Sequence, residues 1–311
     1  MFQANYLMWR VASSSLSYLN RASEHLRLRF SAAVTGNTRL PSRWMKCVTT
    51  TTSSLPNAVG AMYVHQYFNG RSKEEAMEMV GEIRIQFESL LRDVNWMDDK
   101  TKLRAIDKAR SMVTHIGYPT ELEDINKLNS LYSGLDLVPN DYYGNALRTT
   151  LYSTNYAFSK LRQPVDKLDW VRHGRPAVVN AFYSPLENSI QFPAGILQGI
   201  FFNSERPKYL NYGAVGWVIG HEITHGFDDQ GRQFDKNGDL VDWWEQETKD
   251  EFVTRTQCIV SQYNNYTVSL PGVSLGVNGV TTQVTTSPGV RCGACAYHTF
   301  VAPINQKIIQ T

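Results

Sequence analysis

Cysteine, net charge and long hydrophobic runs are all scarce in this sequence of 311 residues. With only four cysteines, the chain is too poor in sulfur to be a small scaffold held by disulfides. A formal net charge of +2 provides no electrostatic footprint for nucleic acid or an anionic membrane surface, so we exclude both as partners. No apolar run reaches membrane-spanning length, and the first residues show no signal peptide.

What is present is the composition of an ordinary globular protein, with 42% hydrophobic and 19% charged residues. A β-branched and aromatic run from Pro176 to Tyr183 predicts strands, which extend to about residue 193. The spacing of apolar residues predicts helices over residues 3–33, 55–95 and 101–115, and again from about Tyr212. The fold class that we predict is therefore mainly α-helical with small β-sheets.

His221, Glu222 and His225 form a His-Glu-x-x-His pattern within the last of these helices. Residues four apart lie on one face of an α-helix, so both imidazoles can point at a single ion. Zinc binds imidazole nitrogens and lowers the pKa of its bound water, and Glu222 would be the general base that takes the proton of that water. The pattern predicts a zinc peptidase; the alternative is a chance match.

Asp228 follows His225 by three residues. At this distance its carboxylate could accept the second N–H of the imidazole and fix its tautomer. The alternative is a solvated carboxylate at the end of the helix, where a negative charge opposes the helix dipole. We predict that Asp228 supports the metal ligand His225.

Three blocks of sequence follow one another: Asn-Ala-Phe-Tyr at 180–183, Phe-Pro-Ala-Gly-Ile-Leu-Gln at 192–198 and Val-Ile-Gly-His-Glu-Ile-Thr-His-Gly-Phe-Asp-Asp at 218–229. Together they resemble the neprilysin and endothelin-converting-enzyme family of zinc metalloendopeptidases, and the resemblance runs from about residue 3 to Gln283. It implies a zincin-type, thermolysin-like catalytic core with part of a helical lid domain. The implied divisions are a helical part of the catalytic domain (1–74), the partial lid (75–145), the zinc-binding core (146–283) and a divergent tail (284–311).

The same resemblance implies how a peptide substrate is held. Asn180 would bind the substrate backbone through its side-chain amide, and Ala181 through its main-chain carbonyl, along an edge strand. Ile196, Phe201 and Val218 would line an apolar pocket, so that small peptides are cut on the amino side of hydrophobic residues. Without the resemblance, the strand reads as buried core and the three apolar residues as ordinary packing.

The family also has a third zinc ligand, the glutamate of a Gly-Glu-Asn-Ile-Ala-Asp motif whose aspartate supports the first histidine. After Gln283 this chain reads Val-Thr-Thr-Ser-Pro-Gly, which puts Thr285 about where the ligand belongs and Gly289 near the aspartate. Neither residue can replace the acid, so we predict one weakly held Zn²⁺ and little turnover. The abrupt change indicates a frame shift, an alternative exon or a gene-model error, and not slow divergence.

Family members are anchored at the cell surface by a single membrane span or are secreted, whereas this chain shows no anchor and Met1 reads as an internal start. Asn265, in an Asn-Tyr-Thr sequon, is a predicted glycosylation site. Cys47 and Cys258 match half-cystines whose family partners lie outside this chain, so we expect both to be unpaired. The pattern at Cys292–Cys295 lacks a second pair, and we predict no redox or zinc site there.

Two other functions stay open. The chain could be a catalytically impaired, truncated isoform or fragment that acts, if at all, as a non-enzymatic binding protein; the missing glutamate favours this reading. A thermolysin-like secreted protease is the second, but residues 180–183 and 226–229 fit that group poorly.

Overall fold

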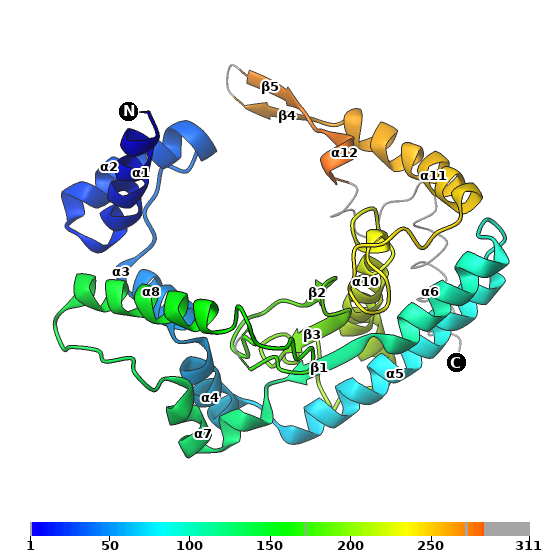
Figure 1. Cartoon of the computed structure of the whole chain (residues 1–311), viewed down its shortest axis with the longest axis horizontal. Coiled ribbons are helices and arrows are strands. Elements are labelled where there is room, and N and C mark those ends of the chain that lie inside the picture. The colour runs from blue at the N-terminus through cyan, green and yellow to red at the C-terminus, as the bar shows by residue number, and fades with distance from the viewer. Residues whose placement is uncertain (1, 172, 271–272, 283–311) are drawn as a thin grey trace. The chain divides into compact units, whose positions relative to one another are not determined.

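The computed structural model describes residues 2–171, 173–270 and 273–282, drawn as ribbons in Figure 1. The described residues are mainly helical with small sheets, which confirms the predicted fold class. Contacts between residues divide the chain into two compact units. The first unit comprises Met1–Val59 and Glu121–Asp166, and the second comprises Gly60–Thr120 and Lys167–Thr311.

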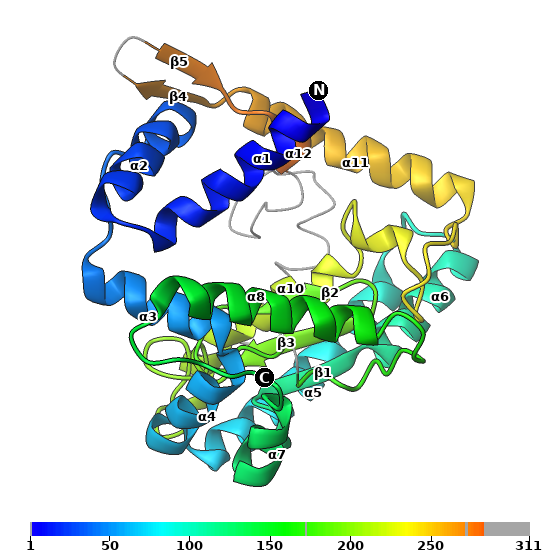
Figure 2. The same ribbon diagram turned by 60° about the vertical axis from the view of Figure 1, so that its left-hand side comes forward.

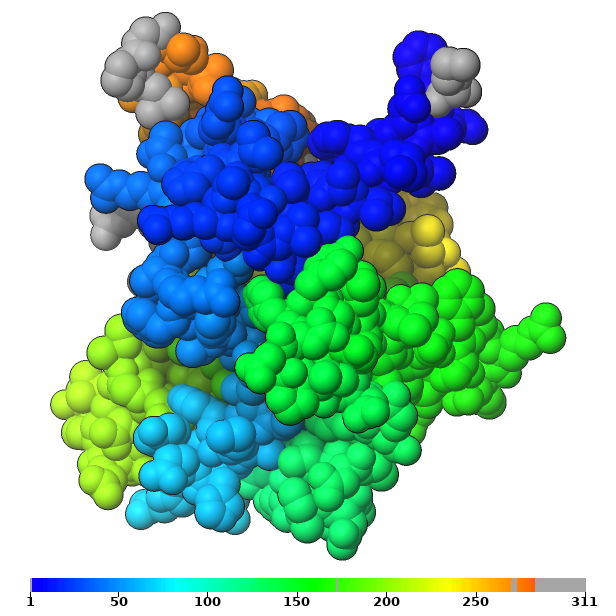
Figure 3. All heavy atoms as spheres, turned by 90° about the vertical axis from the view of Figure 1, so that its left-hand side faces the viewer, coloured from blue at the N-terminus to red at the C-terminus, as the bar shows by residue number. Residues whose placement is uncertain are grey.

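The first unit is a group of helices with very little core. Asn20 caps one of them by accepting the backbone N–H of Ser23, and Gly36 ends that helix in the left-handed conformation. Figures 2 and 3 show the N-terminal helices in blue and α8 in green. None of the α-helices that lie wholly in this unit buries a residue: α1 (Phe2–Ser15), α2 (Arg21–Thr35), α3 (Arg43–Ser54), α7 (Ile125–Leu131) and α8 (Tyr142–Ser159). The 3₁₀ turn η1 (Leu16–Tyr18) joins α1 to α2.

Two long helices, α5 (Gly70–Asp93) and α6 (Asp99–Ser111), carry much of the core of the second unit. Asn69 and Asp98 cap them by accepting backbone N–H groups. The apolar residues of α5 recur every three or four positions, as the sequence predicts, and form its buried face. That face includes Ala76, Met79, Val80, Ile83, Phe87, Leu90 and Leu91. The shorter α4 (Pro56–Tyr67) precedes α5.

A three-stranded sheet in the order β1-β3-β2 belongs to the second unit. Its strands are β1 (Val113–Gly117), β2 (Phe182–Ser184) and β3 (Ser189–Pro193). The central strand β3 pairs in parallel with β1 and antiparallel with β2. Every residue of β3 is buried, as expected for a strand paired on both sides.

One helix prediction extends too far. The helix predicted for residues 101–115 ends at Ser111, and the chain continues as β1. Val113, Thr114 and Ile116 in this strand are β-branched, and pairing with the buried β3 gives them a better environment than another helical turn.

One strand prediction begins too early. The strand predicted from Pro176 starts only at Phe182. Before it, the N–H of Val178 donates to the carbonyl of Arg175, and the carbonyl of Pro176 accepts the N–H of Gly195. The β-branched residues here therefore lie in a turn that packs against the loop after β3.

The helix predicted from about Tyr212 is confirmed. The helix α9 (Lys208–Asn211), the π-helical turn η3 (Tyr212–Gly216) and α10 (Trp217–His225) follow one another directly. The helix α10 packs against α5 and β2. The remaining elements are the 3₁₀ turns η2 (Thr120–Glu123) and η4 (Gly231–Gln233), the helices α11 (Gln246–Asn264) and α12 (Gly279–Thr282), and the hairpin of β4 (Thr267–Leu270) and β5 (Val273–Gly276).

The cysteine prediction holds for one residue. Cys47 is a free thiol, but Cys258 is disulfide-bonded, so the expectation of an unpaired Cys258 is wrong. That expectation considered only the pairing seen in the family and not other bridges. Residues 284–311, including Thr285, Gly289 and the Cys292–Cys295 pattern, lie outside the described residues. Within the described ranges, no helix is both long and apolar enough to cross a membrane.

The two units should differ in local stability. All of β3 is buried, whereas α1, α2 and α8 bury no residue, and segments with few buried contacts open at low free energy. We expect the amides of these three helices to exchange at least about tenfold faster than those of β3 in hydrogen-exchange mass spectrometry of the full chain. Equal protection in the helices and in β3 would contradict this expectation.

His115 in β1 should make the second unit sensitive to acid. Its side chain is 5% exposed and its ring stacks on Trp170 with 4.8 Å between centroids. Burial, and then the nearby His173, lower the pKa of His115 from 6.5 to about 4. The unfolded chain therefore binds a proton at this residue at a higher pH than the folded chain does. Stability consequently falls as the pH drops from about 6.5 to about 4.

Replacing this residue with glutamine (His115→Gln) removes the difference in proton uptake. Between about pH 7 and about pH 5, we expect the unfolding free energy of the wild type to fall by about 2 kcal/mol more than that of the variant. Urea unfolding at both pH values measures the difference. Equal losses of unfolding free energy in the two proteins would show that His115 titrates alike in the folded and unfolded states.

Candidate metal centre

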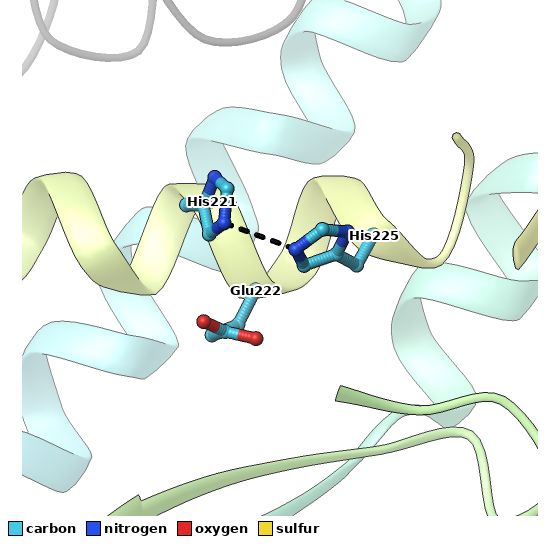
Figure 4. A group of neighbouring side chains, drawn as sticks. All are labelled: His221, Glu222 and His225. Atoms are coloured by element: carbon cyan, nitrogen blue, oxygen red, sulfur yellow. Dashed lines mark hydrogen bonds between the residues drawn. The ribbon is translucent and has the colours of Figure 1, made fainter. Parts of the chain in front are cut away.

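The helix α10 places His221, Glu222 and His225 next to one another (Figure 4). The four-residue spacing brings the two imidazoles together, with their Nε2 atoms 3.0 Å apart. One ligand atom from each of the three residues lies within 4.8 Å of the others. The apolar side of the same helix, including Ile219 and Ile223, is buried in the core and fixes the rotation of the helix. The residues singled out from the sequence are therefore neighbours in the structure.

Asp228 contacts the second histidine. Its Oδ2 lies 2.7 Å from Nδ1 of His225. A carboxylate only accepts, so Nδ1–H of His225 is the donor and its Nε2 carries the lone pair, which faces Nε2 of His221. The other oxygen, Oδ1, accepts the backbone N–H groups of Gln230 and Gly231 at 2.9 and 2.7 Å. Asp228 is buried, so the carboxylate is a fixed partner of His225 and not a solvated group.

The two histidines differ in pKa. Burial, and then the neighbouring His225, lower the pKa of His221 to about 4. Burial also lowers the pKa of His225, but the hydrogen bond and charge of Asp228, with smaller contributions from Glu222 and Asp229, raise it above its ordinary value. His221 is thus neutral at pH 7, the state in which an imidazole binds a metal.

Glu222 is buried beside the two imidazoles, and Figure 4 shows its side chain leaving α10 between them. Burial raises the pKa of its carboxyl group to about 7, although the charge of His225 lowers it. A carboxyl group with a pKa near neutrality can both accept and return a proton.

The first histidine is held differently from the second. Trp217 stacks on the ring of His221, with 5.6 Å between centroids and an interplanar angle of 12°. Nδ1 of His221 is buried and has no hydrogen-bond partner in the described part of the chain. In the described residues no carboxylate or carbonyl therefore holds the Nδ1 side of His221 as Asp228 holds that of His225.

This donor set fits zinc. Two imidazole nitrogens that face each other are ligands that Zn²⁺ prefers, and the Nδ1–H of His225 already has the carboxylate partner typical of a zinc-bound histidine. Among residues 2–171, 173–270 and 273–282, no other His, Cys, Asp or Glu joins the group.

The predicted substrate-binding residues all precede this centre in the sequence. Asn180 is exposed, and its Oδ1 accepts the N–H of Ala181 at 2.9 Å. Both residues come just before β2, the edge strand that packs against α10. Ile196 and Val218 are buried in the core, and Phe201 packs against it. This packing agrees equally with a substrate pocket and with ordinary core.

Sequence reasoning missed two residues that shape the segment after α10. Lys108 is 1% exposed, and Gly231 lies so close to the helix that a Cβ atom would be 1.8 Å from the carbonyl oxygen of His225. Lys108 did leave one signal, because it stands in α6 at helical spacing from the apolar Ala105 and Met112. Nothing in the sequence marked Gly231.

Comparison with known proteins identifies the family. Two family models, both described as peptidase family M13, match residues 2–119 and 180–307. The second match continues beyond Gln283, where we placed the end of the resemblance. Neprilysin-2 of Drosophila melanogaster is 49% identical over 308 residues, covering 94% of this chain and 40% of the relative. An endothelin-converting enzyme homolog of Locusta migratoria is 39% identical over 297 residues, covering 96% of this chain and 40% of the relative.

A solved structure agrees with these relatives. The zinc metalloprotease Zmp1 of Mycobacterium tuberculosis, in complex with an inhibitor, is 34% identical and superposes with a TM-score of 0.78, covering 89% of this chain and 41% of Zmp1. The chain thus spans about 40% of the length of the curated relatives it matches. Because two models of one family match most of its residues, the chain belongs to peptidase family M13, which confirms the resemblance to neprilysin and the endothelin-converting enzymes.

Proposed function

We propose that this chain carries the metal-binding helix of a neprilysin-type, zinc-dependent metalloendopeptidase. The observation that supports this most directly is the pair of Nε2 atoms of His221 and His225, 3.0 Å apart, with Asp228 fixing the tautomer of the second histidine. His221 and His225 would hold one Zn²⁺. When bound there, zinc would polarise the peptide carbonyl and make a water molecule more acidic.

Glu222 is the general base in this proposal. Its carboxylate accepts the proton of the attacking water and afterwards gives a proton to the departing amine. A pKa of about 7, raised by burial, suits both steps at neutral pH. Asp228 does not touch the substrate; it orients His225 through Nδ1.

The substrates that we propose are small peptides cut on the amino side of hydrophobic residues. A peptide would lie along the free edge of β2, held by the side chain of Asn180 and the carbonyl of Ala181. Ile196, Phe201 and Val218 would receive the hydrophobic side chain. The exposure of Asn180 and the position of β2 beside α10 support this placement.

A location and a domain organisation are also proposed, by analogy with the relatives. We propose a cell-surface or secreted protein that is glycosylated at Asn265, which is exposed at the end of α11. The proposed divisions remain a helical part of the catalytic domain (1–74), part of a lid (75–145) and the zinc-binding core (146–283).

An impaired chain is the second candidate. Thr285 and Gly289 stand where a ligand glutamate and its supporting aspartate belong by resemblance. The buried Nδ1 of His221, without a partner among the residues described, agrees with the loss of that aspartate. In this case zinc is held weakly and the chain is a non-enzymatic binding protein.

Replacing the general base should separate catalysis from metal binding. In Glu222→Gln, we expect cleavage of a fluorogenic peptide with a phenylalanine after the scissile bond to fall at least about 100-fold, because the proton acceptor is lost. Zinc content, measured on the same samples, should stay unchanged. Equal cleavage by both proteins would reject Glu222 as the base, and no cleavage by the wild type would favour the non-enzymatic candidate.

Removing the carboxylate charge of Asp228 should weaken zinc binding. In Asp228→Asn, the amide supports the Nδ1–H tautomer of His225 less well, and changes of this kind typically cost about 10- to 100-fold in metal affinity. Competition with a chromogenic chelator measures the affinity. The exposed Asp239→Asn is the matched control and should bind zinc like the wild type. An Asp228→Asn variant that bound zinc as tightly as the control would refute the supporting role.

A further inference from the structure

Lys108 is a buried cation with no part in the proposed chemistry. It lies on α6, and its side chain is almost completely enclosed. Burial lowers the pKa of Lys108 to about 7, while the carboxylates of Asp228 and Asp235 raise it. A buried lysine is unfavourable unless its N–H groups are satisfied by hydrogen-bond acceptors.

All three hydrogen bonds of the ammonium group go to one short segment. Nζ donates to the carbonyl oxygens of Gly226, Gly231 and Phe234, at 2.7, 2.8 and 2.6 Å. An ammonium group has three N–H donors, so these bonds saturate it. The three acceptors span residues 226–234, the segment that follows α10. Lys108 therefore ties both ends and the middle of this segment to α6.

The same segment carries Asp228. The carboxylate of Asp228 accepts the N–H of Gly231, whose own carbonyl accepts Nζ of Lys108. Gly231 also touches the end of α10 so closely that a side chain has no room there. A shift of the segment would thus move the carboxylate that meets Nδ1 of His225 at 2.7 Å.

We propose that Lys108 is a positioning residue for the metal ligand His225: it holds residues 226–234 so that Asp228 keeps His225 in the Nδ1–H tautomer. This inference rests on the proposed zinc-binding function. Lys108 acts on His225 indirectly. Its Nζ donates to the carbonyl of Gly231 in the segment, and Asp228 in the same segment accepts Nδ1–H of the imidazole.

The alternative is a lysine that only stabilises the fold. Lys73 offers a matched control, since its Nζ donates to the carbonyl of Tyr118 at 3.1 Å and lies 4.3 Å from the centroid of that ring. Lys73→Met removes a lysine and its carbonyl contact outside residues 226–234. A purely structural role predicts that Lys108→Met and Lys73→Met differ in stability only.

The test reads the tautomer of His225 directly in the zinc-free full chain. Nitrogen-15 NMR of histidine-labelled protein, at a pH where the imidazoles are neutral, distinguishes Nδ1–H from Nε2–H. The chain has seven histidines, so the spectrum of His225→Gln assigns the signal. We expect the Nδ1–H tautomer of His225 in the wild type and in Lys73→Met. In Lys108→Met we expect a mixture of tautomers, as in Asp228→Asn.

Zinc affinity is the second readout. We expect Lys108→Met to bind zinc at least about tenfold more weakly than Lys73→Met, as is typical when outer contacts of a ligand are lost. A wild-type tautomer in Lys108→Met, together with zinc affinity equal to that of Lys73→Met, would overturn the proposal. If Lys108→Met does not fold, Lys108→Gln, which keeps an N–H donor, takes its place. The same tautomer mixture and weaker zinc binding are then expected, and their absence would again overturn the proposal.

The two readouts also separate this inference from the proposed function. If the wild type binds no zinc, the proposed function fails, and the tautomer of His225 alone decides the role of Lys108.

Discussion

The hydrogen bond between Nδ1 of His225 and Asp228 is the contact on which the metal centre depends. It leaves a lone pair on Nε2 and fixes the direction of the ring. Asp228 reaches His225 only because the chain folds back immediately after α10. There Gly231 packs against the end of the helix, and Lys108 donates hydrogen bonds to residues 226–234. A local pattern of eight residues therefore needs a partner from a helix more than a hundred residues away in the sequence.

Sequence reasoning succeeded where the physics is local. The spacing of His221 and His225 fixes their common face on any α-helix, and a carboxylate three residues further on lies within reach of the second ring. The apolar period of α5 likewise predicts its buried face. It failed where distant contacts decide, as in β1, which becomes a strand only because β3 lies beside it. Lys108 belongs to the same class, since its acceptors are distant in sequence.

The two histidines are not equivalent, and this asymmetry links the fold to the second candidate function. His225 has a buried carboxylate partner, whereas His221 is held by the stacked ring of Trp217 and its Nδ1 has no partner among the described residues. Membership of peptidase family M13 explains why such a helix is present. How strongly the helix holds metal in this chain depends on the less supported of its two ligands.

X-ray absorption at the zinc edge of the zinc-loaded full chain shows directly whether His221 and His225 hold the metal. We expect a first shell of nitrogen and oxygen at about 2.0–2.1 Å, with the outer scattering of two imidazole rings. Replacing both histidines with alanine should abolish the imidazole signal. A first shell of sulfur at about 2.3 Å, or an imidazole signal that survives the double replacement, would show that these two histidines are not the ligands.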